Sequence, residues 1–561
     1  MIFLAGQLSH LIPAARGLVP ADIVYRNAEI FDAFSCTWEH NDLAVKDGII
    51  VGIGSGYRGV RERNLSGAYL VPGLIDAHVH IESSLLVPQE YARLVSAHGT
   101  TTVIADPHEI ANVAGTAGIE YMLASRAGLP IDIRYMLPSC VPATPTDVGG
   151  ATLDAKALAF FARRDGVLGL GEMMNVPGVL AGDTEVTDKI GLFEVRDGHA
   201  PLLSGNDLNA YVLAGLQSDH ECTALEEARE KLRRGMYIFI RDGSTEHNIP
   251  ALVPLVTPYT VSRCSFATDD CHADLLMREG HIDRCIRLAA ECGLEPETAI
   301  RMATLSAAER FGLTDRGALA PGRRADLCIV SALRPFTVKE TVFSGTPGNN
   351  GPVSTAPAPL ADTVRCRVPA RDRIRIDGNG KARVIGLVPG QILTEAPEYD
   401  IRAADLPDTH RDLLKVVVCN RYGNNKTGTG IVHGFGFKKG AIAASVSHDA
   451  HNIVATGAGD DEILAAIGAV IRSGGGMAAA DGDTISVLPL DCAGLMSTLP
   501  AGDVVRHLDE LRRITSGMGG IAEPFMYLSF LALTVIPALR ITDRGLFDGV
   551  GFRDVPVFLD R

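Results

Sequence analysis

The sequence predicts an α/β protein: a (β/α)8 barrel of the TIM type, a small composite β-sheet domain, and an additional C-terminal α+β domain. Three observations predict it. The chain has 561 residues, more than the roughly 250–300 that one hydrophobic core serves. In the middle of the chain, apolar runs alternate with helical segments, as parallel β/α units require. Short strand-like segments with Asp-Gly and Gly-Ser turns lie on both sides of that region.

Four segments follow from this pattern. Residues 1–70 and 315–361 are expected to supply the two halves of the composite β domain, and the second half ends in a linker rich in Gly, Pro and Ser at 344–361. Residues 71–314 are expected to form the barrel. Residues 362–561 then form the C-terminal α+β domain.

Eight apolar runs in the central segment are predicted to be the barrel strands, although the fifth and sixth are weak by strand propensity alone. They are residues 69–80, 101–106, 131–139, 167–173, 199–205, the stretch ending at 218–221, 236–244 and 264–270. Between strands, residues 281–292 show helical i, i+3, i+4 spacing. Gly293 suits the left-handed turn after that helix, and Pro296 suits the first turn of the next.

Composition excludes several classes of partner. The formal net charge of −15 argues against a nucleic acid, whose binding needs clustered Lys and Arg. No stretch approaches the ~18 unbroken apolar residues of a membrane span, and the N-terminus lacks the basic start of a signal peptide. The eleven Cys include no C-x-x-C pair, which fits reduced thiols. We therefore expect a cytoplasmic protein without a membrane or nucleic-acid partner.

Polar residues accompany the predicted strands. In a β/α barrel the active site forms at the C-terminal ends of the strands, so residues placed there belong together. The polar residues at or near the predicted strand ends are His78, His80, Glu172, His199, His220, Asp269 and Asp270. His199 opens the fifth run, so it lies at the same rim only if that strand is shifted to end at His199.

These residue types indicate a metal centre. His78 and His80 are two apart in an extended segment, so both point to the same side and can bind one ion. Imidazole and carboxylate ligands suit zinc, iron or manganese. Five or six ligands are enough for two metals, and Glu172 could bridge them. A pair of metals can hold a hydroxide and polarise its target.

Longer motifs extend along the chain from about residue 20 to the C-terminus. They are "PGLIDAHVHIESS", "ADPHEIANVAG", "GEMMNVPGV", "GHAP", "LNAYVLAG", "SDHE", "ATDD", "GALAPGRRADLCIV" and the tail motif "SVSHDAHNI". Together they resemble one known family, the bacterial-type adenine deaminases of the amidohydrolase superfamily.

The resemblance implies a fold, a reaction and a ligand set. It implies that a metal hydroxide converts adenine, a small-molecule purine, to hypoxanthine and ammonia. Two divalent ions, Mn or Fe(II), would be held by His78, His80, Glu172, His199, His220 and Asp269.

Catalytic roles are assigned to carboxylates. Asp269 would take the proton of the attacking hydroxide and pass it toward the departing amine. Glu221, beside a ligand, is the first candidate for protonating the ring, followed by Glu109 and Glu82. Other roles stay open: Glu221 can support a ligand, Glu109 can cap a helix, and Glu82, like Asp270, can bind substrate.

Some questions stay open. Cys271 and Ala273 depart from the family pattern just past Asp269, so a different aminopurine, or a cyclic amide or N-acyl amine, is an alternative substrate. A non-catalytic scaffold is disfavoured, because all six ligands are present. His448 and His451 would share a face only on a helix; they could form an auxiliary metal site, a wall of the barrel mouth or a structural turn. We expect a homodimer, the commonest assembly.

Overall fold

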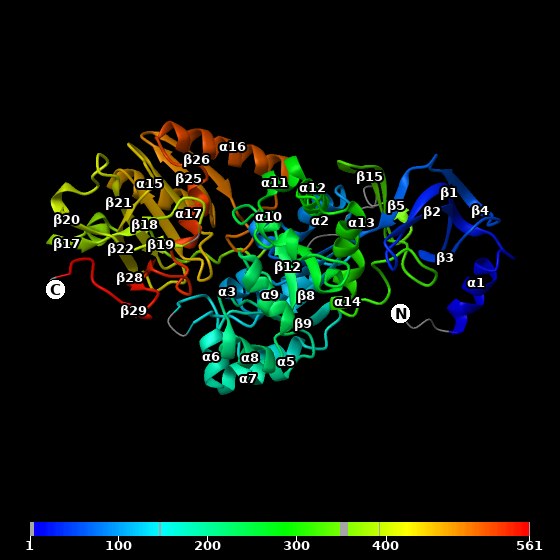
Figure 1. Ribbon diagram of the computed structural model, residues 1–561. Coiled ribbons are helices and arrows are strands. Elements are labelled where there is room, and N and C mark those ends of the chain that lie inside the picture. The colour runs from blue at the N-terminus through cyan, green and yellow to red at the C-terminus, as the bar shows by residue number, and fades with distance from the viewer. Residues whose placement is uncertain (1–4, 145–146, 348–356, 392, 560–561) are drawn as a thin grey trace.

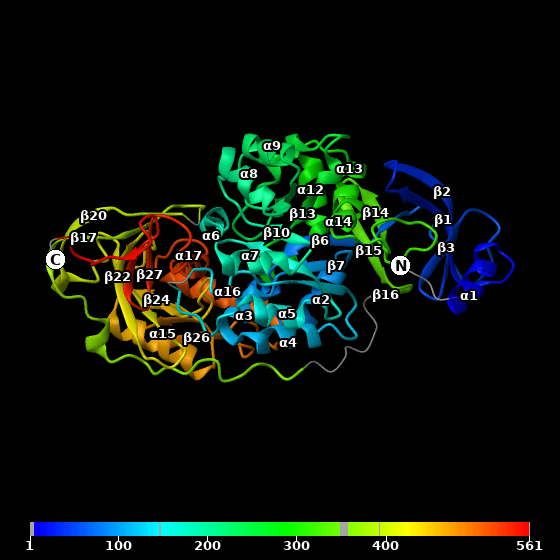
Figure 2. The same cartoon turned by 90° about the horizontal axis from the view of Figure 1, so that it is seen from below.

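The computed structural model describes residues 5–144, 147–347, 357–391 and 393–559. Three bodies lie in a row: a β-sheet unit at the right of Figure 1, a barrel in the middle, and an α+β unit at the left. Figure 2 shows the same order from below. The predicted fold class is confirmed.

The barrel consists of eight parallel strands. Two sheets, β6 to β10 and β11 to β13, close into one barrel. Gln217 N donates to Arg196 O at 3.2 Å on one side, and a parallel bridge joins Val79 to Asp269 on the other. The strands are β6 (Leu74–Val79), β7 (Thr100–Ala105), β8 (Asp132–Leu137), β9 (Val167–Met173), β10 (Arg196–Gly198), β11 (Ser218–Asp219), β12 (Tyr237–Arg241) and β13 (Cys264–Ala267).

Two strand predictions need correction. The fifth strand is Arg196–Gly198, not 199–205, because Pro201 has no N–H to donate to a sheet. The shift considered for His199 is confirmed: it directly follows the strand. The first run, 69–80, is two strands, because the chain leaves one sheet and enters another at Gly73, where a Cβ would lie 2.1 Å from Thr101 Oγ1.

Helices surround the barrel. The predicted helix at 281–292 is confirmed, Gly293 has a φ of +93°, and Pro296 opens the next helix. The α-helices around the barrel are α2 (Pro88–Ser96), α3 (His108–Ala114), α4 (Thr116–Ala124), α5 (Ala155–Phe161), α6 (Val176–Ala181), α7 (Thr184–Gly191), α8 (Gly205–Leu213), α9 (Leu225–Arg233), α10 (Ile249–Leu252), α11 (Ala273–Glu279), α12 (Ile282–Glu291), α13 (Pro296–Arg301) and α14 (Ala307–Arg310).

The composite sheet joins segments from both sides of the barrel. Its strand order is β16-β15-β14-β5-β1-β2-β3, with β4 beside β1. The elements are α1 (Ala5–Ala15), β1 (Ala21–Asp32), β2 (Thr37–Lys46), β3 (Ile49–Ile53), β4 (Gly59–Asn64), β5 (Tyr69–Pro72), β14 (Leu327–Leu333), β15 (Phe336–Phe343) and β16 (Thr346–Pro347). Of the predicted linker, 348–356 lies outside the described residues.

The C-terminal unit is built on an eight-stranded sheet of order β19-β18-β22-β21-β24-β23-β25-β26. Its strands are β18 (Ile385–Leu387), β19 (Thr394–Glu395), β21 (Leu413–Cys419), β22 (Thr427–His433), β23 (Ala441–Ala444), β24 (Ile453–Gly457), β25 (Gly476–Asp481) and β26 (Thr484–Pro489). Its helices are α15 (Asp460–Arg472), α16 (Ala501–Gly517) and α17 (Pro524–Phe530). Small sheets comprise β17 (Asn379–Arg383) with β20 (Glu398–Arg402), and β27 (Leu539–Thr542), β28 (Gly545–Asp548) and β29 (Arg553–Asp554).

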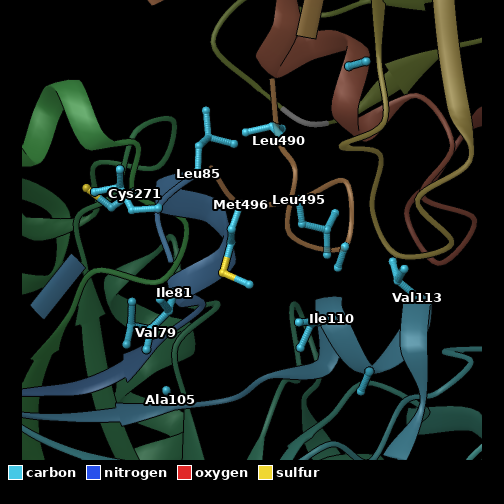
Figure 3. Packing of buried hydrophobic residues seen from close by; sticks show 14 of the residues in the cluster. Val79, Ile81, Leu85, Ala105, Ile110, Val113, Cys271, Leu490, Leu495 and Met496 are labelled. Carbon is cyan, nitrogen blue, oxygen red and sulfur yellow. The ribbon is translucent and has the colours of Figure 1, made fainter. Parts of the chain in front are cut away.

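One hydrophobic cluster continues from the barrel into the C-terminal unit. In Figure 3, Leu85 and Ile81, which follow strand β6 of the barrel, lie beside Leu490 and Met496 of the C-terminal unit. Burial of this shared apolar surface holds the C-terminal unit against the ends of the barrel strands. Within the described ranges, no helix has both the length and the apolar character needed to cross a bilayer.

Candidate functional site

Six predicted residues meet at the C-terminal rim of the barrel, at or just after β6, β9, β10, β11 and β13. We call His78, His80, Glu172, His199, His220 and Asp269 the rim cluster. All except His199 have 3% or less of their surface exposed, so water cannot balance their charge. The cluster must balance its charge internally.

Glu172 lies between two groups of imidazoles. Its Oε1 is 3.1 Å from His80 Nε2, whereas its Oε2 is 2.7 Å from His199 Nδ1 and 3.3 Å from His220 Nε2. Burial by itself would raise the pKa of Glu172, but the hydrogen bonds with these rings outweigh it and hold that pKa well below its usual value. An ionised carboxylate with each oxygen toward a different imidazole group has the arrangement of a bridge between two cations.

The hydrogen bonds of His80 test whether a metal fits. Its Nδ1 is 3.0 Å from the carbonyl oxygen of Asp106, which can only accept, so Nδ1 carries a proton. In the neutral ring, the Nε2 lone pair then faces carboxylate oxygens of Glu172 and Asp269 at 3.1 and 3.0 Å. This arrangement requires a positive charge. Imidazole oriented by a backbone carbonyl, together with carboxylates, is a donor set that fits a divalent ion.

Asp269 connects the rim cluster to a buried arginine. Its Oδ1 is 3.3 Å from His78 Nε2, and Arg241 Nη1 donates to its Oδ2. Burial would raise the pKa of Asp269, but the Arg241 charge and the imidazoles hold it well below its usual value. Arg241 was not predicted as a site residue. The sequence does contain a signal for it, because Arg241 is the charged residue that ends the apolar run "MYIFIR".

Glu221 also contacts Arg241. Arg241 Nη1 donates to Glu221 Oε1 at 2.5 Å, and the same oxygen lies 3.5 Å from His220 Nε2. Ser83 Oγ donates to Asp270 Oδ1. Glu221 and Asp270 both line the pocket above the rim cluster.

Glu82 lies beside the site and contacts the first turn of α3. Its Oε1 accepts from Ile110 N at 3.1 Å, and Glu82 is not among the residues that line the pocket. Burial raises its pKa to about 7. Its predicted contact with substrate stays a prediction.

His108 is a site residue that the sequence analysis did not assign. Its Nδ1 is 3.5 Å from Glu172 Oε1, and its ring centroid is 4.4 Å from that of His80. It lies at the start of α3, after strand β7, where a polar residue is well placed to reach the rim. The signal was present in "ADPHE".

The pocket has walls from two parts of the chain. It encloses about 460 Å³ of space between atoms, including its mouth. Barrel residues of the rim form one wall. The C-terminal unit forms the other, with His448, Asp449, Phe530, Leu533 and Ile536. Figure 1 shows α17, which contains Phe530, on the barrel side of the C-terminal sheet.

A second polar cluster lies on this pocket. We call Glu109, His448, Asp449 and His451 the turn cluster. Glu109 Oε1 is 2.5 Å from His448 Nδ1, and Glu109 Oε2 contacts His451 Nε2. His448 and His451 lie on neither a helix nor a strand but in a turn, which brings both rings to one carboxylate.

The two departures from the family pattern lie away from the pocket. Cys271 and Ala273 are buried in the hydrophobic cluster of Figure 3 and are not among the residues that line the pocket. The sequence-based reason for expecting an altered pocket is therefore not supported.

Known proteins match most of the chain. The model of the "Amidohydrolase family" matches residues 69–348, and that of the "Adenine deaminase C-terminal domain" matches residues 391–553. An "Adenine deaminase" of Methanoregula boonei is 71% identical, covering 98% of this chain and 99% of that protein. One of Methanoculleus marisnigri is 62% identical over 92% of this chain and 99% of its own length. Among solved structures, N-acetyl-D-glucosamine-6-phosphate deacetylase from Mycobacterium smegmatis is 20% identical with a TM-score of 0.45, covering 58% of this chain and 99% of that one.

Proposed function

The chain belongs to the adenine deaminase family, and from this premise we propose that it hydrolyses adenine to hypoxanthine and ammonia. The observation that carries the proposal is the placement of Glu172 between two imidazole groups under a pocket. Adenine and water supply all the atoms of hypoxanthine and ammonia, so no further reactant is required.

We propose that the rim cluster holds two divalent ions, manganese or iron(II). His78, His80 and Asp269 would hold one, His199 and His220 the other, and Glu172 would contact both. Bound metal ions lower the pKa of a coordinated water to about 7 and polarise the atom under attack. Both metals accept these ligands, and their supply in the cell decides between them.

Side chains of the pocket would move the protons. Asp269 lines the pocket beside the imidazoles of the rim cluster, so it could accept a proton from the attacking water and return it to the amino nitrogen as ammonia leaves. Arg241 holds the other oxygen of Asp269 and so fixes its orientation. Glu221 remains our first candidate to protonate ring nitrogen N1, because it lines the pocket beside His220.

Adenine is preferred over the alternatives raised by the sequence. A different aminopurine, a cyclic amide or an N-acyl amine was suggested by Cys271 and Ala273, and neither residue lines the pocket. The homodimer and the cytoplasmic location stay predictions.

The test is ammonia release from protein stripped of metal and reloaded with manganese or iron(II). Adenine, other aminopurines, aminopyrimidines and cyclic amides are offered in parallel. Metal-dependent turnover of adenine that is abolished in His80→Ala is the expected result. Turnover of another compound in place of adenine would remove the substrate assignment, and no turnover with metal bound would remove the proposal entirely.

A further inference from the structure

The turn cluster contains a carboxylic acid whose role is not explained by the metal centre. Asp449 is 7% exposed and lines the pocket from the C-terminal side. Its Oδ2 is buried and has no hydrogen-bond partner among the residues that the structure describes. A buried carboxyl oxygen without a partner is costly, so the group is expected to serve a ligand.

The turn that carries Asp449 is held rigidly. His451 N donates to Ser447 O at 2.7 Å, and His448 N donates to the carbonyl of Ser529 at 2.9 Å. The His448 ring stacks on Phe530, with 4.8 Å between centroids. Asp449 is therefore presented to the pocket by a fixed backbone.

The other acid of the cluster is already engaged. Ser447 N donates to His451 Nδ1 at 3.1 Å, so in the neutral ring the proton is on Nε2 and points to Glu109. A metal on Nε2 would need the ring proton on Nδ1, which this bond prevents, so the arrangement argues against an auxiliary metal site. Burial would raise the pKa of Glu109, but His448 and His451 hold it well below its usual value. Glu109 thus connects the barrel to the turn through His448 and His451, and its predicted catalytic role stays a prediction.

Asp449 differs from Glu109 in its surroundings. The nearest charged partner is His108, whose Nε2 is 4.0 Å from Asp449 Oδ1, beyond hydrogen-bond distance. Burial raises the pKa of Asp449 to about 7, although the His108 charge opposes this. Near neutral pH the group can therefore both donate and accept a hydrogen bond.

We propose that Asp449 is a substrate-binding residue supplied by the C-terminal unit, and that its carboxyl group hydrogen-bonds a ring nitrogen of the purine. Free adenine presents ring nitrogens that accept hydrogen bonds and one ring N–H that donates, so a carboxyl group can match a neighbouring acceptor and donor. This inference rests on the proposed hydrolysis of adenine. In this arrangement, barrel residues contact the part of the substrate that reacts, and Asp449 of the C-terminal unit binds the purine ring.

The test compares Asp449→Ala and Asp449→Asn with the wild type, all loaded with manganese. Adenine, 3-deazaadenine, 7-deazaadenine and 9-methyladenine are used as substrates or competitive inhibitors. Asp449→Ala is expected to lower kcat/KM for adenine about 10- to 100-fold. Asp449→Asn keeps a donor and an acceptor, so its kcat/KM for adenine is expected to fall less. The loss should be smaller for the analogue that lacks the contacted ring atom.

Asp543→Asn is the matched control for Asp449→Asn. Asp543 is also a buried acid of the C-terminal unit, and its Oδ1 likewise has no hydrogen-bond partner among the described residues. Its Oδ2 accepts from Asn420 Nδ2 at 2.9 Å, and Asp543 does not line the pocket, so the comparison isolates the effect of facing the pocket. Its substitution should leave kcat/KM unchanged. Metal content and circular dichroism establish that the Asp449 variants are folded and loaded.

The outcomes separate the two proposals. Wild-type protein that fails to convert adenine with metal bound overturns the proposed function itself. If the wild type is active, but Asp449→Ala stays within about threefold of it, loses equally with all four purines, or loses its metal, only the role of Asp449 is overturned.

Discussion

The rim cluster and the turn cluster both contribute side chains to the same pocket but are assembled in different ways. Every member of the rim cluster comes from the end of a barrel strand, and neighbouring strands are about 4.8 Å apart. The turn cluster joins Glu109 of the barrel to His448 and His451, which are 339 and 342 residues away in the chain. The rim cluster thus depends on the barrel, whereas the turn cluster depends on how two units dock. The two should respond differently to mutation.

The largest effect is expected from Glu172→Gln. Glutamine loses the charge that lies between the two imidazole groups, and its amide nitrogen turns a donor toward one of them. Metal content should fall, and ammonia release from adenine should drop by at least about a thousandfold. Both are measured on the same preparation. Glu120→Gln, which loses only an exposed ion pair with Arg164, is the control; a Glu172→Gln protein with full metal and activity would contradict the bridging role.

The Glu109→Gln substitution should show whether the turn cluster can be disrupted while the rim cluster stays intact. It removes the carboxylate that holds His448 and His451, and breaking a buried charged network costs about 3–5 kcal/mol of stability. We expect kcat/KM to fall about 10- to 100-fold while the metal content stays near that of the wild type. Loss of metal together with activity would show that the two clusters are one structural unit.

The contribution of the turn cluster to the free energy of unfolding should also depend on pH. Burial lowers the pKa of His448, but the nearby Glu109 charge outweighs this and raises it to about 9. Its unfolded value is about 6.5. The stabilisation is therefore complete below about pH 6.5 and is lost as the pH rises through about 9.

Calorimetry of the wild type and the His448→Gln variant tests whether the stabilisation by His448 decreases as the pH rises. The difference in thermal midpoint should be largest near pH 6 and should shrink toward pH 9.5. In a Glu109→Gln background the pH-dependent part of that difference should disappear. A difference that grows with pH would mean that His448 is neutral in the folded protein.

The smallest effect is expected from Arg512→Ala. Arg512 of α16 donates to Asp274 of the barrel helix α11 at 2.7 Å, is 27% exposed, and also pairs with Asp509 and Glu523 of its own unit. Because the arginine is partly in solvent, we expect the loss of its contact with the barrel to have a modest effect. Looser docking should lower kcat/KM a few-fold without changing metal content. Arg506→Ala, on the same helix but paired within it and 75% exposed, is the control and should change neither.

Much of the barrel and its candidate metal site could be predicted from the sequence. Strand β9 begins and ends where the apolar run "VLGLGEM" does, and the rim residues were recognisable because polar side chains close apolar runs. The fifth strand was misplaced because Pro201 was included in it. Arg241 and His108 were missed because one charge or one imidazole at a strand end looks like any other polar residue. Their meaning depends on Asp269 and Glu172, which lie far away in the sequence.

By itself, the sequence determined the barrel, the residue types of the rim cluster and the rim on which they lie, because strand periodicity and the parallel β/α arrangement are local properties. Only the tertiary structure decided which oxygen of Glu172 faces which imidazole, that Glu109 contacts both His448 and His451, and that Asp449 lines the pocket. Each of these depends on side chains brought together by the docking of the C-terminal unit, and no local pattern encodes the distance between residues more than 300 positions apart.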